Sequence, residues 1–134
     1  MQNRTEPTTA VGTQTPAGLQ TRIDELTGIY PAVDKILDGI SDLAGLISTP
    51  ERTAVALMAL AGSPDGHDVI GILADTLVQL TDQNTNPGLT AIPAARQHDI
   101  RERTEEFAAY VRDFLPRDLV VWTTWDLDPS NIPA

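Results

Sequence analysis

The most regular pattern in the chain is an apolar stripe near its start. Its members alternate in steps of four and three residues, and they are Leu19, Ile23, Leu26, Tyr30, Val33, Leu37, Ile40, Ala44 and Ile47. This spacing keeps side chains on one face of an α-helix, because the helix has 3.6 residues per turn. Pro31 interrupts the stripe, and a proline inside a helix costs about 3 kcal/mol. We therefore predict one helix near 18–28 and another over 31–48, with a single kinked helix as the alternative.

Three further helices are predicted from the same periodicity and from capping residues. Thr49-Pro50 begins a helix over 50–61, which is apolar on all sides after its first turn. Ser63-Pro64 begins a helix over 64–82, and the last runs over 93–115. In the helix over 64–82 the residues predicted to face inward are Ile70, Leu73, Leu77 and Leu80, widened by Val69 and Ala74.

The two ends of the chain differ from this helical part. Residues 1–17 are polar, rich in Thr and interrupted by Pro and Gly, which is typical of a flexible arm. Residues 119–125 are β-branched and aromatic, which favours an extended chain. We predict an all-α fold with an arm over 1–17, a compact bundle of four to five helices over 18–115, and an extended aromatic segment and tail over 116–134.

Charge and composition narrow the possible functions. The net charge of −10 argues against binding a nucleic-acid backbone or an anionic membrane surface. The chain contains no cysteine, no apolar run of membrane-spanning length and no signal-like apolar segment at its start. We expect a soluble protein of the cytoplasm, or one inside a particle assembled in the cell, such as a virion.

No motif for catalysis or metal binding is visible. In Asp65-Gly66-His67-Asp68 the ligands diverge around one turn, and His98 with Glu102 lacks the inward glutamates of a di-iron bundle. Neither a Gly-x-Ser-x-Gly elbow nor a phosphate-binding glycine loop occurs, and no acid lies at a predicted core position. We predict a protein that is not an enzyme and has no cofactor, catalytic or metal site; a cofactor-independent enzyme is a further alternative.

Aspartates form two regular rows along the predicted helices. One row repeats every four residues and the other every seven; the members are Asp34, Asp38, Asp42, Asp68, Asp75 and Asp82. Such an acidic face is either a solvated outer surface or an imitation of DNA phosphates that binds a basic protein.

Aromatic residues gather late in the chain. Five of the six lie within residues 107–125: Phe107, Tyr110, Phe114, Trp122 and Trp125. They either seal one end of the bundle or anchor an interface, where Trp and Tyr are enriched. The candidate partner contacts are Trp122, Trp125 and Tyr110. We therefore expect an assembly subunit that binds other protein subunits or copies of itself, for instance in a phage particle, with a DNA-mimicking regulator as the alternative.

Overall fold

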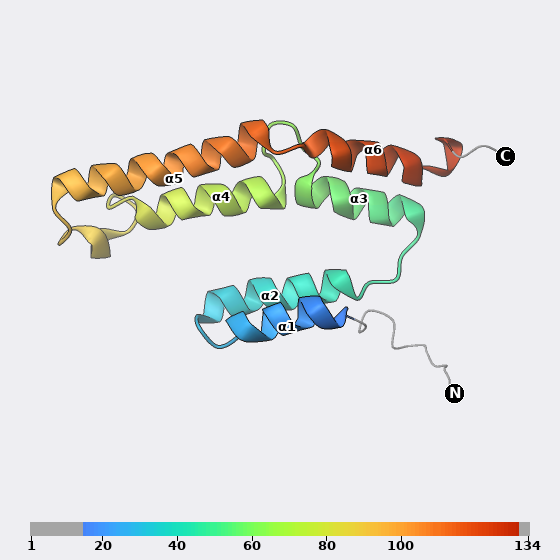
Figure 1. Ribbon diagram of the computed structural model, residues 1–134, viewed down its shortest axis with the longest axis horizontal. Coiled ribbons are helices and arrows are strands. Elements are labelled where there is room, and N and C mark those ends of the chain that lie inside the picture. The colour runs from blue at the N-terminus through green and yellow to red at the C-terminus, as the bar shows by residue number, and fades with distance from the viewer. Residues whose placement is uncertain (1–14, 132–134) are drawn as a thin grey trace. The chain divides into compact units, whose positions relative to one another are not determined.

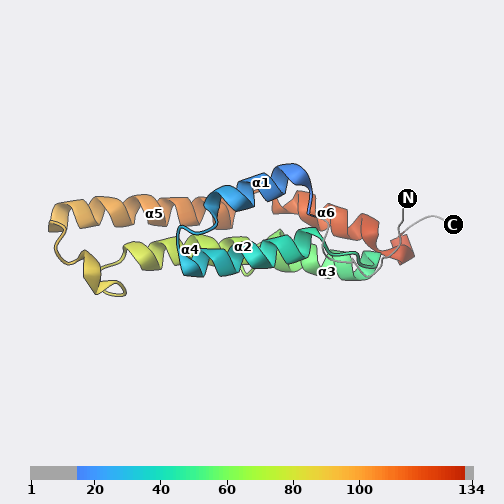
Figure 2. The same ribbon diagram turned by 90° about the horizontal axis from the view of Figure 1, so that it is seen from below.

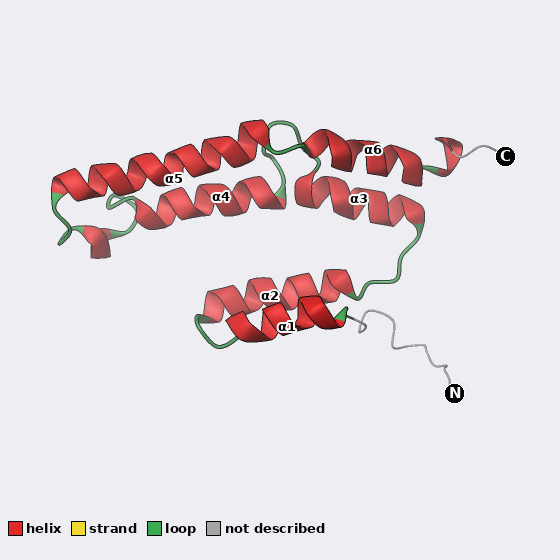
Figure 3. Ribbon diagram, in the orientation of Figure 1, coloured by secondary structure: helices red, strands yellow, loops and turns green. Residues whose placement is uncertain are grey.

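The computed structural model describes residues 15–131, and within that range the chain forms six α-helices and two 3-10 helices, without a strand (Figures 1 and 3). The predicted all-α class is therefore confirmed. Contacts divide the described residues into an N-terminal unit that ends at Ser48 and a C-terminal unit that begins at Thr49. Most of the predicted arm, and the last three residues of the predicted tail, lie outside the described residues.

The N-terminal unit is a helical hairpin of α1 (Ala17–Leu26) and α2 (Pro31–Ala44). Gly28 has a φ of +91°, in the left-handed region that favours glycine, and allows the tight turn between the helices. Pro31 lies in the first turn of α2, so the chain forms two helices and not one kinked helix. Ile23 and Leu37 are the buried apolar side chains of this hairpin.

The C-terminal unit consists of two antiparallel helix pairs. The helices are α3 (Pro50–Ala61), α4 (Val69–Thr81), α5 (Ala94–Phe114) and α6 (Arg117–Leu127). Helix α4 packs along α5, and α3 packs along α6 (Figures 1 and 2). Short 3-10 helices at Pro87–Leu89 and Pro129–Asn131 precede α5 and follow α6.

The contact between α4 and α5 is made by small side chains. Ala74, Ala108 and Val111 form the buried cluster, and Val78 and Leu115 pack against it. The hydroxyls of Thr81 and Thr104 lie 2.9 Å apart and extend the same seam. We name these positions the seam. On α4 the seam positions are Gly71, Ala74, Val78 and Thr81. On α5 they are Thr104, Ala108, Val111 and Leu115.

The row of larger residues in α4 lies beside this seam and not within it. Ile70, Leu73, Leu77 and Leu80 each precede a seam position by one residue, and they are 36–59% exposed. The prediction that they face inward is therefore wrong for the described chain. Small residues allow the two helix backbones to approach closely, and the next row is then rotated by about 100° away from the contact.

The segment after Pro116 is helical, whereas an extended segment was expected. Pro116 precedes the first turn of α6, where Asp118 supplies a negative charge favourable to the helix N-terminus. Packing along α3 then outweighs the β-propensity of Val120, Val121 and the tryptophans. This sixth helix adds one to the five that periodicity located.

Candidate interaction site

A buried ion pair joins the two helix pairs of the C-terminal unit. Arg117 donates from Nε to Asp68 Oδ2 at 2.7 Å and from Nη2 to Oδ1 at 3.1 Å. Asp68 is 2% exposed and Arg117 6% exposed. The pair lies at the connection from α3 to α4 and at the connection from α5 to α6, so it fixes the junction between the two helix pairs.

Both members of this pair also satisfy the backbone at helix ends. Asp68 accepts from the N–H of Gly71 at 2.9 Å and thereby caps α4, and it accepts from the N–H of Ser63 at 3.1 Å. Arg117 Nη1 donates to the carbonyls of Val111 and Arg112 in the last turn of α5. Helix ends leave such groups without intrahelical partners, so this one ion pair completes two helix termini.

The hydrogen bonds determine the charge state of the pair. Burial by itself raises the pKa of Asp68, but the hydrogen bonds from Arg117, Gly71 and Ser63 outweigh burial and hold that pKa below 3.8. The hydrogen bond to Asp68 raises the pKa of Arg117 above its usual value. Both groups are therefore charged at neutral pH, and their role is to position the helices around them.

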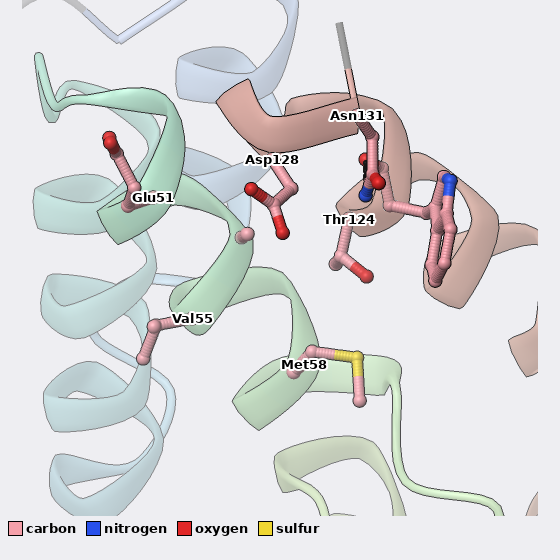
Figure 4. Close-up of a pocket in the computed structure, with 8 residues that line it drawn as sticks. Glu51, Val55, Met58, Thr124, Asp128 and Asn131 are labelled. Carbon is pink, nitrogen blue, oxygen red and sulfur yellow. Dashed lines mark hydrogen bonds between the residues drawn. The ribbon is translucent and has the colours of Figure 1, made fainter.

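A groove of about 480 Å³ lies between α3 and α6 (Figure 4). Its lining is Glu51, Ala54, Val55, Met58, Thr124, Trp125, Asp128 and Asn131. Asp128 accepts from the N–H and the hydroxyl of Ser130, and these bonds lower its pKa. The groove thus combines apolar walls with two carboxylates, a lining that suits an apolar side chain bordered by a positive charge.

The helix pair α4–α5 has one polar face. Asp75 and Gln79 of α4 line a hollow of about 400 Å³ together with Glu105 and Arg112 of α5, and Arg112 lies 3.9 Å from Asp75. Each of these four residues follows a seam position by one. The residues that follow the seam therefore share one face of the pair, and those that precede it share the opposite face.

Apart from the exposed Arg103, that opposite face is apolar. It carries a row from each helix, which we together name the apolar strip: Ile70, Leu73, Leu77 and Leu80 of α4, and Phe107, Tyr110 and Phe114 of α5. These seven side chains are 36–69% exposed. The rings of Tyr110 and Phe114 pack against each other with centroids 5.4 Å apart. Periodicity located the α4 row but assigned it to the core, whereas the α5 row was not separated from the buried Val111.

The three aromatic residues singled out as partner contacts are all exposed. Tyr110 belongs to the apolar strip, Trp125 lines the groove, and Trp122 lies on α6. Tyr110 and Trp125 are thus on different helix pairs of the same unit. The sequence placed these residues in one segment, and the structure assigns them to different surfaces.

The aspartates of the predicted acidic face have unequal environments. Asp68 is buried in the ion pair, so it belongs to no exposed row, and the prediction that it is part of an acidic face is wrong. Asp75 is close to Arg112, and Asp82 ends α4, where its side chain accepts from the N–H of Asn84. In the N-terminal unit Asp34 accepts from the N–H of Gly28, while the remaining two members of that row, Asp38 and Asp42, are exposed.

The burial of Asp68 could not be predicted from the sequence, because its partner Arg117 lies 49 positions away. A local signal did exist, since Asp68 precedes an apolar helix and Asp is a favoured N-cap. Nothing local marked Arg117 as the residue that neutralises it.

Over residues 15–131 the structure shows no group of three or more His, Asp or Glu side chains arranged to hold a metal ion. None of the helices in the described part of the chain is both long enough and apolar enough to cross a membrane. The chain matches no protein-family model, and no similar curated protein or solved structure was found.

Proposed function

We propose that this protein is a non-enzymatic assembly subunit that binds another protein chain through the apolar strip. The observation that carries the proposal is the exposure of seven large apolar side chains on one face of α4 and α5. Monomeric proteins rarely expose a contiguous apolar patch of more than a few hundred Å², and larger patches mark interaction sites.

The composition of the seam supports the same conclusion. The buried cluster between α4 and α5 consists of two alanines and one valine, with one further valine and one leucine beside it. Small side chains bury little apolar area, while seven of the larger apolar residues of the two helices lie on the strip. A helix pair is stabilised by covering its apolar face with another layer, and a binding partner provides that layer.

The groove with Trp125 is the second contact that we propose. Trp is enriched among the residues that dominate binding energy, and this one borders a hollow with apolar walls. A partner side chain that fills the groove would lie beside Glu51 and Asp128, so an apolar segment with a neighbouring Lys or Arg fits best.

The alternative of an acidic DNA mimic has less support. It requires an even array of exposed carboxylates, but in the C-terminal unit Asp68 is buried and Asp75 lies near a guanidinium. The apolar strip, by contrast, has four exposed members on α4 and three on the C-terminal half of α5.

The test compares two positions of α4. Leu77 lies on the strip, whereas Ile72 lies on the opposite face, where it is 61% exposed. A photo-reactive amino acid in place of Leu77 should crosslink a protein partner in the native source, whereas the same group in place of Ile72 should not. Equal crosslinking at both positions, or none at either, would refute the role of the strip.

A further inference from the structure

We infer that the partner of the apolar strip is a second copy of this chain, packed face to face and antiparallel. This inference rests on the proposed function, because it identifies the protein that the strip binds. Three features of the strip support it: its area, the symmetry of its spacing and the position of one charge.

The area of the strip matches what a stable dimer needs. From the exposed fractions of its seven side chains, the strip presents about 600 Å² of apolar surface, taking about 200 Å² for an aromatic and about 130 Å² for an aliphatic side chain. A stable interface buries about 800 Å² per partner, of which about 500 Å² is apolar. The strip alone therefore supplies the apolar part of a standard interface.

The spacing of the strip is the same in both directions. The α4 row, Ile70, Leu73, Leu77 and Leu80, has steps of 3-4-3. The α5 row, extended by the exposed Arg103 to include Arg103, Phe107, Tyr110 and Phe114, has steps of 4-3-4. When a second copy runs antiparallel to the first, each row therefore faces the same row of the second copy with matching spacing.

The two rows also share one centre. The contact between Thr81 and Thr104 fixes which residues of α4 and α5 lie at the same level. At 1.5 Å per residue, the midpoints of the two rows then differ by only about 2 Å along the helices. One two-fold axis across the strip relates both rows to their copies, which is the geometry of an isologous dimer.

The position of Arg103 favours the antiparallel orientation over the parallel one. In the antiparallel arrangement Arg103 lies across from Phe114 of the second copy, next to Asp113, whose carboxylate also lies 3.5 Å from Arg112 of its own chain. A guanidinium is attracted both to an aromatic face and to a carboxylate. In the parallel arrangement the same end of each helix pair meets its copy. The two Arg103 side chains then lie at the same end, away from Phe114 and Asp113 of the other copy.

The first experiment measures the mass of the full chain by sedimentation over a range of concentrations. We expect a two-copy mass for the wild type and for Ile72→Gln. Leu77→Gln should raise the dissociation constant by about 30-fold or more, because the change enters a symmetric interface twice. A wild type that stays monomeric at high micromolar concentration, or an equal effect of both substitutions, would overturn the inference.

The second experiment tests orientation with cysteines, which the natural chain lacks. Under mild oxidation, a mixture of Arg103→Cys and Phe114→Cys chains should form the mixed disulfide. Arg103→Cys alone should remain reduced. Efficient disulfide formation by Arg103→Cys alone, without the mixed product, would overturn the antiparallel arrangement.

The two proposals fail in distinguishable ways. A monomeric wild type whose Leu77 crosslinks a different protein would contradict the second copy and keep the proposed function. A monomeric wild type that crosslinks nothing through Leu77 would contradict both.

Discussion

Replacing Arg117 with Met removes the cationic half of the buried ion pair and keeps most of the length of the side chain. Arg117 donates to both carboxylate oxygens of Asp68 and to two carbonyls at the end of α5. In Arg117→Met these acceptors lose their donors, while the carboxylate of Asp68 stays 2% exposed and keeps only its bonds from Gly71 and Ser63.

The expected cost is large because the remaining charge is buried. Removing one partner of a buried ion pair costs about 3–5 kcal/mol, against a typical total stability of about 5–15 kcal/mol. The matched control is Arg101→Met, since Arg101 pairs with Glu105 at 3.3 Å with side chains 41% and 52% exposed. An exposed pair of this kind contributes only about 0.3–0.5 kcal/mol.

The assay is urea unfolding at one fixed protein concentration, followed by far-UV circular dichroism and by tryptophan fluorescence. Both tryptophans lie in α6, so the fluorescence reports on the helix that begins at Arg117. If Arg117→Met does not fold, Arg117→Lys retains the charge without the two-point contact and should lose an intermediate amount. Losses for both Arg117 variants no larger than that of Arg101→Met would refute the structural role of the ion pair.

Three further predictions concern single residues. The pKa of Asp68 is lowered in the folded chain, so the contribution of this carboxylate to the free energy of unfolding is complete above about pH 5 and is lost as the pH falls through 3.8 towards the folded-state pKa. Acid titration of the free energy of unfolding should therefore show a steeper decline for the wild type than for Asp68→Asn. Identical slopes would contradict this. Gly71→Ala should strongly lower the melting temperature, because the added Cβ would overlap the backbone of Gly66. Gly39→Ala has open space around its Cβ and should raise the free energy of unfolding by up to about 1 kcal/mol. The opposite order would show that the turn before α4 is placed differently. Thr49→Ala removes the N-cap of α3 and should cost about 1 kcal/mol in the same unfolding assay, an effect that Thr49→Ser should largely restore.

Local signals predicted most of the helices. Pro31 and Thr49-Pro50 mark the starts of α2 and α3 in the structure as they did in the sequence. Each signal acts within one helical turn, through a fixed φ angle or a side-chain hydrogen bond to a nearby N–H. The start of α4 was placed too early, because Asp68 and not Ser63 caps that helix.

Contacts between distant residues could not be predicted in this way. Helix α6 depends on packing along α3, which overrides the β-propensity of its own residues. Periodicity also could not distinguish the seam of α4 from the row one position earlier, since Ala74 and Leu73 both belong to rows of helical spacing. The candidate site could not be predicted for the same reason, because the α4 row of the apolar strip is the row that lies one position before the seam.

The pairing of the helices in the C-terminal unit has a consequence for the order in which it folds. Helices α4 and α5 are joined by residues 82–93, whereas α3 and α6 are separated by the whole of that hairpin. Closing a longer loop costs more chain entropy, so we expect the α4–α5 hairpin to form first and its closure to bring the ends of α3 and α6 together. Amide protons of α3 and α6 should therefore exchange with solvent before those of α4 and α5, and the ion pair marks the boundary between the early and late parts of the unit.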